Sequence, residues 1–325
     1  MVANRSNSTE PEQQETLLTI YWLWFCQFLV IGLTNGFMVF VILRYEALRT
    51  RKEYLIILGL STADAFSLLA YGIGAIYRIA LIYTNQFTST RAVIYCVLLP
   101  QNLLWTWFET SAPLMLVTVS LDRLISVTFP RRYWRFGTSY AYILLFLSFG
   151  AGGVVLLLQL LLALLNFDNL GTSTAPCYTG KNFLAINAYY ALYALNAPPI
   201  WGVVSVLLYI AVGVAYAKKN QSIDASQLNI SQSQEERIRQ RRLTLSLGLS
   251  CLCTLGLLVI PVALAYSGEA RGWNRMVLQS LWLVQNLNPF CNMLIYFKRQ
   301  AELRKAAWAF CKCKNMPPNL TAWNI

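Results

Sequence analysis

Four charged side chains stand inside, or at the edge of, long apolar stretches of this 325-residue chain: Asp64, Glu109 and the adjacent pair Asp122 and Arg123. A charge in apolar surroundings is expensive, so such groups are rare and mark polar clusters, ion pairs or ligand contacts. A carboxylate next to an arginine can hold the guanidinium in one state and release it in another. Asp122 and Arg123 therefore predict a two-state switch at the end of an apolar helix.

The elements that must position these residues are membrane-spanning helices. Hydrophobic residues make up 57% of the chain and charged residues 12%, against about 45 to 50% and about 25% in soluble domains. A helix needs roughly 20 apolar residues to cross a bilayer. Seven stretches qualify, one of which ends at Asp122 and one of which is interrupted only by Asp64; the other five are 16–43, 136–167, 182–217, 243–268 and 276–297.

We therefore expect an all-α fold, with a seven-transmembrane helix bundle over residues 17–297 and a polar tail at 1–16. After the seventh span, Leu303, Ala307, Phe310 and Cys311 recur at helical spacing between basic residues. This pattern predicts an amphipathic helix over 298–313 that lies on the membrane surface, followed by a tail at 314–325.

The loops predict how the chain is oriented in the lipid bilayer. Lysine and arginine bias a loop to the cytoplasmic side, and 20 of the 26 basic residues fall on one side of the predicted bundle. The remaining six are Arg5, Arg78, Arg91, Lys181, Arg271 and Arg275. We expect a multi-pass plasma-membrane protein with an extracellular amino terminus and a cytoplasmic carboxyl terminus. The glycosylation acceptor patterns at Asn4 and Asn7 agree with this orientation.

The net charge of +12 does not indicate a nucleic-acid partner, because the basic residues fall in short clusters between apolar runs.

Three motifs carry a resemblance to rhodopsin-like (class A) G-protein-coupled receptors. Asp122, Arg123 and Leu124 resemble the acid-arginine-aromatic triplet at the end of the third helix, with leucine in place of the usual tyrosine. Asp64, in Leu-Ser-Thr-Ala-Asp, resembles the acid of the second helix. The seventh span resembles the Asn-Pro-x-x-Tyr motif from Asn292 to Tyr296, without its proline.

The resemblance implies a receptor that binds an extracellular ligand, a small molecule or a peptide, and activates a heterotrimeric G protein. The runs that begin at Arg51 and at Leu121 are similar to those of nematode serpentine receptors, which implies a chemosensory or neuropeptide-like role. The residues that the family's pattern assigns to the activation switch are Asp122, Arg123, Pro261, Asn292 and Tyr296.

The pattern also implies a polar core at Asn35, Asp64 and Asn288. Sodium binding there stays open, because Ala112 stands where relatives often have a serine. The sixth span lacks the family's tryptophan before Pro261 and has no acid placed to hold Arg123. We therefore expect Asp122 alone to hold it.

The ligand pocket is expected in the upper half of the bundle, where Trp105, Trp107, Phe108 and Glu109 face a cavity. Three interpretations of Glu109 remain: a counter-ion for a ligand cation, a member of the Asp64 cluster, or a protonated acid with a structural role. Two further sets have two interpretations each. Arg78 is either a solvated anchor at the membrane boundary or a contact for a ligand anion, and Tyr189 and Tyr193 line either the pocket or the interface.

For four of the eight cysteines the sequence predicts a disulfide or a modification. Cys96 and Cys177 fall on the oxidising side of the membrane, where we expect a disulfide rather than two free thiols. Cys311 and Cys313 lie beside the membrane on the cytoplasmic side and are candidates for palmitoylation.

The alternative to a receptor is a seven-helix ligand-gated channel with the opposite topology, which the distribution of basic residues disfavours. A membrane enzyme or transporter is disfavoured because the chain has no histidine and no internal repeat. We expect no enzyme activity, no cofactor and no metal-ligand cluster.

Overall fold

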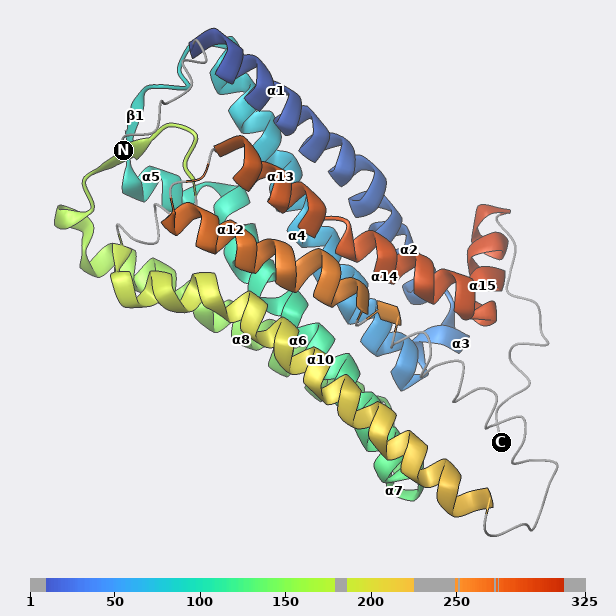
Figure 1. The fold of residues 1–325 in the computed structure, drawn as a ribbon. Helices are drawn as coiled ribbons and strands as arrows, with labels where there is room; N and C mark the ends of the chain where they lie inside the picture. The colour runs from blue at the N-terminus through green and yellow to red at the C-terminus, as the bar shows by residue number, and fades with distance from the viewer. Residues whose placement is uncertain are drawn as a thin grey trace.

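The computed structural model describes residues 10–178, 186–224, 249–250, 252–271, 273 and 275–312, and the helices of these segments run beside one another in an elongated bundle (Figure 1). The helices are α1 (Glu10–Gln27), α2 (Leu33–Arg44), α3 (Glu46–Arg49), α4 (Lys52–Tyr83), α5 (Val93–Leu98), α6 (Pro100–Thr128), α7 (Pro130–Arg135), α8 (Thr138–Leu165), α10 (Ala188–Asp224), α12 (Ile260–Ala270), α13 (Arg275–Gln285), α14 (Asn288–Arg299) and α15 (Ala301–Cys311). Two π-helical segments, η1 (Phe28–Gly32) and η3 (Leu255–Val259), a 3₁₀ turn η2 (Phe167–Asn169) and the strands β1 (Thr90–Ala92) and β2 (Thr172–Thr174) complete the described part.

Five helical segments are long and apolar enough to cross a membrane: Gln14–Arg44, Lys52–Tyr83, Pro100–Thr128, Thr138–Leu165 and Asn196–Lys218. A shorter apolar helix, Leu252–Ala265, includes η3. The last crossing consists of α13 and α14, which are separated at Asn286 and Leu287. The all-α prediction is confirmed for the described residues, apart from one small sheet.

The outside of the bundle is apolar. On α8, the side chains of Phe146 and Leu165 are 77% and 72% exposed, and Phe40 on α2 is 67% exposed. Large apolar side chains in such numbers on a surface indicate contact with lipid. This surface and the spanning helices identify a multi-pass membrane protein.

The centre of the bundle is α6, which packs against α4, α8 and α10. Close approach depends on glycine at two places. A Cβ atom on Gly152 would lie 2.5 Å from the carbonyl oxygen of Trp107, and one on Gly59 would lie 2.8 Å from the Cε atom of Met115. A larger side chain at Gly152 would push α8 away from the α6 backbone, whereas one at Gly59 would force the side-chain ends of Met115 and Leu145 to move.

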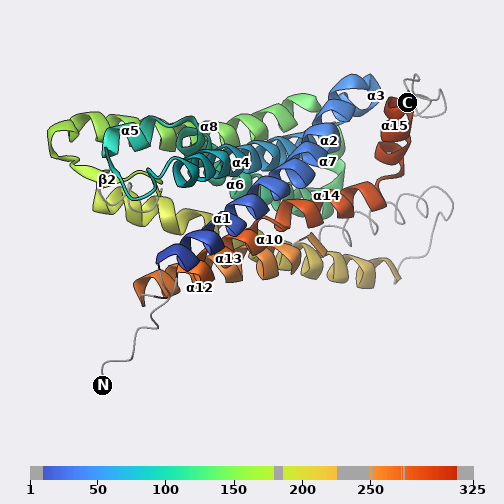
Figure 2. The same cartoon turned by 90° about the horizontal axis from the view of Figure 1, so that it is seen from above.

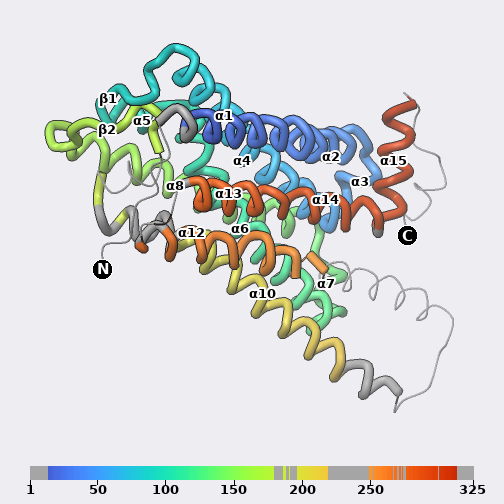
Figure 3. The backbone as a smooth tube through the Cα atoms, turned by 45° about the horizontal axis from the view of Figure 1, so that its top comes forward, coloured from blue at the N-terminus to red at the C-terminus, as the bar shows by residue number. Residues whose placement is uncertain are grey.

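One end of the bundle carries α5 and the sheet (Figure 3). Strands β1 and β2 are antiparallel, with Thr90 opposite Thr174 and Ala92 opposite Thr172. The sequence predicted no strand here, because neither three-residue segment shows an alternating apolar pattern.

The opposite end carries α3, α7 and α15 (Figure 2). Helix α15 lies where the sequence predicts an amphipathic helix: its Leu303 is fully buried, whereas its Trp308 is 66% exposed. Glu302 Oε2 joins it to α4, with Arg51 Nη1 at 2.6 Å and the hydroxyl of Tyr54 at 2.8 Å. These two contacts fix α15 to the first turn of α4 and the residue before it.

Candidate functional site

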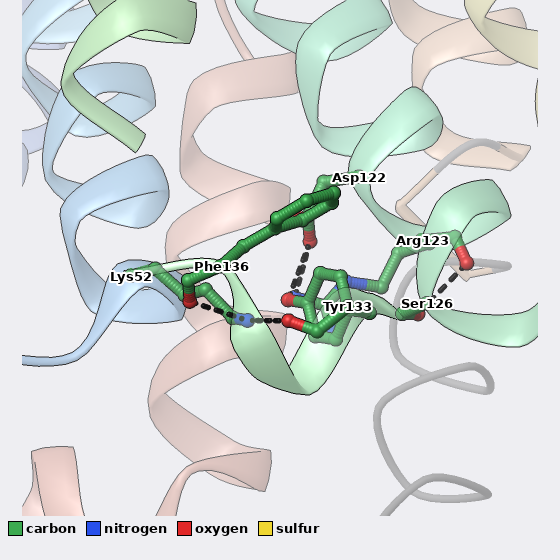
Figure 4. Close-up of polar contacts among 6 residues, drawn as sticks. All are labelled: Lys52, Asp122, Arg123, Ser126, Tyr133 and Phe136. Atoms are coloured by element: carbon green, nitrogen blue, oxygen red, sulfur yellow. Dashed lines mark hydrogen bonds and ion pairs between the residues drawn. The ribbon is translucent and has the colours of Figure 1, made fainter. Parts of the chain in front are cut away.

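At the α7 end of α6, Asp122 and Arg123 form a buried ion pair. Arg123 Nη2 lies 2.5 Å from Asp122 Oδ2, with side-chain exposures of 10% and 1%. The backbone of this turn is also fixed, because the Ser126 hydroxyl donates to the Arg123 carbonyl at 2.8 Å (Figure 4). The predicted switch pair is therefore present in a closed arrangement, with the guanidinium held by its neighbour.

Tyr133 on α7 completes this arrangement. Its hydroxyl donates to Asp122 Oδ2 at 3.3 Å and accepts from Arg123 Nη2 at 3.5 Å. Burial raises the pKa of the Tyr133 phenol well above its usual range, the Arg123 charge opposes that shift and the Asp122 charge adds to it. The hydroxyl therefore stays protonated and available as a donor. The expectation that Asp122 alone holds Arg123 is corrected: a tyrosine from the following helix holds both members.

Lys52, the first residue of α4, fixes α7 in turn. Its ammonium donates to the carbonyl oxygens of Tyr133 at 2.5 Å and Phe136 at 3.1 Å (Figure 4). The same nitrogen lies 3.5 Å from the centroid of the Tyr133 ring, within the range of a cation–π interaction. These carbonyls lie in the last turn of α7 and at the residue that follows it, where a cation is favourable. Sequence reasoning missed Lys52, and the only available signal was its place two residues before the apolar run that begins at Tyr54.

The predicted polar core is divided into separate hydrogen-bond groups. Asn35 Nδ2 donates to the Ile31 carbonyl of its own helix segment at 3.0 Å. Asn288 Oδ1 accepts from the Thr254 hydroxyl at 3.3 Å. The predicted association of Asn35 and Asn288 with Asp64 is therefore not made through hydrogen bonds among the described residues.

Asn292 and Tyr296 follow Asn288 on α14, and both are buried. Asn292 Oδ1 accepts a hydrogen bond from the Ser250 hydroxyl, so this motif contacts the sixth span through an amide–hydroxyl pair. Pro261 is buried at the start of α12, directly after η3. Pro261 therefore lies on the span that contains the π-helical segment η3. Asn292 and Tyr296 lie on the span that is broken at Asn286.

Glu109 connects three helices. Its Oε2 accepts from the Ser67 hydroxyl on α4 at 3.1 Å, and its Oε1 accepts from Gln285 Nε2 on α13 at 2.5 Å. Ser67 is three residues after Asp64, so Glu109 meets α4 within one turn of that acid. Asp64 is 4% exposed and has no hydrogen-bond partner within the described ranges. Of the three interpretations of Glu109, these contacts favour membership of the Asp64 region.

The disulfide prediction is confirmed. Cys96 on α5 and Cys177 after β2 are bonded, with their Cα atoms 5.2 Å apart. The bond lies at the end of the bundle that carries the sheet, so that β1, α5 and the segment after β2 form one connected unit.

Residues 29–310 match the family of serpentine type 7TM GPCR chemoreceptors called Srsx. The chain belongs to this family. Among curated proteins, none matches the sequence. The match runs from η1 through most of α15, so this Srsx protein is a G-protein-coupled chemosensory receptor with seven transmembrane helices, and the channel alternative receives no support. The family is one of receptors and not of enzymes.

Two aromatic pocket candidates of this Srsx receptor lie on α6. The indole N–H of Trp105 donates to the Tyr71 hydroxyl at 3.0 Å, and Phe108 stacks on Phe66 with 4.7 Å between ring centroids. Trp107 is different: it donates to the Phe149 carbonyl on α8 and is 37% exposed. The expectation that it faces the cavity is wrong, because adjacent helical residues point in directions about 100° apart.

Arg78 requires a second correction. The solvated-anchor interpretation predicted exposure, but the residue is 8% exposed and enclosed by aromatic rings. Cys311 is an exposed free thiol on α15. The other predicted positions lie outside the described residues: Asn4, Asn7, Cys313 and the side chains of Tyr189 and Tyr193.

Proposed function

We propose that this Srsx receptor is a rhodopsin-like receptor that transmits ligand binding at the sheet end of the bundle to a heterotrimeric G protein at the α7 end. The observation that carries the proposal is the buried group formed by Asp122, Arg123 and Tyr133. A guanidinium enclosed in this way cannot contact another protein. The described arrangement is therefore a resting state, and signalling requires the group to open.

The free energies of these contacts are of the size that ligand binding can supply. The two hydrogen bonds of the Tyr133 hydroxyl contribute about 0.5–1.5 kcal/mol each in net terms, and a ligand shifts a two-state equilibrium by its difference in affinity for the two states. A ligand that binds the open state about a hundredfold more tightly supplies about 2.7 kcal/mol. That amount is comparable to the combined contribution of the two hydrogen bonds of Tyr133.

The proposed orientation places the amino terminus and the sheet outside the cell, and α7, α15 and the carboxyl terminus in the cytoplasm. The uneven distribution of basic residues supports this orientation, and so does the disulfide between Cys96 and Cys177, which requires an oxidising compartment. In this arrangement residues 1–16 are an extracellular tail, 17–297 the bundle, 298–313 the membrane-surface helix and 314–325 a cytoplasmic tail. Glycosylation at Asn4 and Asn7 and palmitoylation at Cys311 and Cys313 belong to the same proposal.

The ligand contacts proposed on the outer half are Arg78, Trp105, Phe108, Glu109, Tyr189 and Tyr193. Asn35, Asp64 and Asn288 are proposed as buried polar positions of the bundle. Asn292, Tyr296 and Pro261 are proposed as switch positions on the sixth and seventh spans.

The test is ligand-library signalling through a promiscuous G protein, with the wild type compared with Arg123→Ala at matched surface expression. A response that the Arg123→Ala variant loses, and that an Arg91→Ala variant on the other end retains, is the expected result. Arg91 is a suitable control because it is exposed on β1. A ligand-gated current that persists in the Arg123→Ala variant would refute the proposal.

A further inference from the structure

Arg78 lies near the sheet end of α4, buried beneath the segment that follows β2. Its Nε donates to the Pro176 carbonyl at 3.2 Å. Three rings surround its guanidinium carbon, with centroids 5.7 Å away at Tyr21, 5.4 Å at Trp24 and 5.4 Å at Tyr178. The positive charge therefore has aromatic faces and one carbonyl as its observed surroundings.

No carboxylate lies within 4.0 Å of this guanidinium in the part of the chain that the structure describes. The two ion pairs in that part belong to Arg51 and Arg123. A buried ionic group without a counter-charge is unfavourable in a membrane protein, and such a group marks a functional site by default. Among the described residues, Arg78 therefore lacks an anionic partner.

Other donors lie beside the charge. Gly74, one turn before Arg78, leaves space between α4 and α6: a Cβ atom there would be 3.4 Å from Arg78 Nη1 and 3.6 Å from Gln101 Cγ. Gln101 is 5% exposed, and its amide makes no hydrogen bond to the described residues. The buried indole N–H of Trp24 also has no acceptor among them.

We propose that Arg78, Gln101 and Trp24 form a binding site for the carboxylate of the receptor's ligand, an organic monocarboxylic acid with an apolar body. A guanidinium matches a carboxylate in charge and in its paired donor geometry. The amide of Gln101, whose Cγ faces Gly74 as Arg78 Nη1 does, supplies a further donor, and the aromatic rings supply apolar contact for the rest of the molecule. This site specifies the chemical class of ligand in the proposed function. It rests on that function, because the ligand must enter from the sheet end of the bundle.

A purely structural role for Arg78 is the competing explanation, since its Nε also holds the segment after β2. Tyr77 provides a matched control for that role. Its hydroxyl donates to the Ala175 carbonyl at 2.9 Å, so Tyr77→Phe loosens the same segment without changing any charge.

The experiment measures thermal stabilisation of the purified full-length receptor in nanodiscs by short-chain and aromatic carboxylic acids, each paired with its primary amide. At least one acid is expected to raise the melting temperature while its amide does not. Arg78→Gln should lower the affinity for that acid by about tenfold or more, in line with the loss of hydrogen bonds to a charged group. Arg78→Lys should restore part of the affinity, and Tyr77→Phe should retain it.

Gln101→Leu keeps the test decisive if Arg78→Gln does not fold. Because the Gln101 amide has no hydrogen bond to lose among the described residues, this variant should keep the melting temperature of the empty receptor and still bind the acid more weakly. The proposal is overturned if no acid stabilises the receptor, if acid and amide act equally, or if Tyr77→Phe weakens binding as much as Arg78→Gln. The assay contains no G protein, so acid binding without signalling would refute the coupling proposal and leave this site standing.

Discussion

The Tyr133 hydroxyl donates a hydrogen bond to the Asp122 carboxylate across the junction between α6 and α7. The helix that follows the switch pair therefore takes part in holding it. In a bundle whose sixth span supplies no acid to Arg123 in the described part, the restraint on this arginine comes from its own helix and from the next one.

Tyr133→Phe should raise signalling in the absence of ligand. The change removes the only group of Tyr133 that contacts both Asp122 and Arg123, while the ring and its packing stay. A loss of about 1–2 kcal/mol from the closed state corresponds to roughly a five- to thirtyfold change in the equilibrium between closed and open receptor. Basal G-protein activation at matched surface expression measures it, with Tyr142→Phe, an exposed tyrosine on α8, as the control. Basal activity equal to that of the control would contradict the closed-state interpretation.

Lys52→Met should release α7 from α4. The methionine keeps the apolar stem, whereas both hydrogen bonds to the Tyr133 and Phe136 carbonyls are lost, which should destabilise this turn by about 1–3 kcal/mol. Hydrogen–deuterium exchange over residues 130–136 should accelerate, and basal signalling should rise with it. Arg49→Met, at an exposed position on α3, should leave both quantities unchanged.

The Glu109 and Gln285 side chains should be energetically coupled. Their hydrogen bond joins α6 to α13 and involves a carboxylate in a buried setting. A double-mutant cycle with Glu109→Ala and Gln285→Ala, read from unfolding free energies in detergent, should give a coupling of about 1.5–3 kcal/mol. Additive effects of the two changes would show that the contact does not contribute.

Cys177→Ser should lower stability as much as the Cys96→Ser, Cys177→Ser double variant does, because one bond is lost in each case. The disulfide closes a segment with a sequence separation of 81, for which chain entropy predicts about 4.5 kcal/mol. Thermal unfolding of receptor from surface-labelled cells checks this prediction. Cys26→Ser, at an exposed free thiol, should have no comparable effect. A double variant clearly less stable than either single variant would show that the thiols act separately.

Much of the fold was predictable because hydropathy reports which segments are apolar. The first five crossings and the position of α15 follow from that signal. The seventh crossing is less regular than its apolar run suggests: the helix stops at Gln285 and begins again at Asn288, with Pro289 in its first turn. Local chemistry at Asn286 and Leu287 decides this break, and an average over twenty residues does not detect it.

The site was predictable only where its partners are neighbours in sequence. Asp122 and Arg123 are adjacent, so their pairing could be inferred directly. Lys52 meets Tyr133 across 81 positions, and Gln285 meets Glu109 across 176. Such contacts depend on how the helices rotate and pack. Arg78 shows the same limit, since Tyr21 and Trp24 of α1 enclose it together with the segment after β2.

The segment Ala175–Tyr178 is attached to three different helices. The Cys177 disulfide ties it to α5 directly before α6, Arg78 and Tyr77 hold it to α4, and the Tyr178 hydroxyl lies 2.9 Å from that of Tyr21 on α1. Because the segment is attached at three points to different helices, it cannot rotate about a single hinge. A molecule bound against this segment would therefore displace α1, α4 and α5 together and not the segment alone.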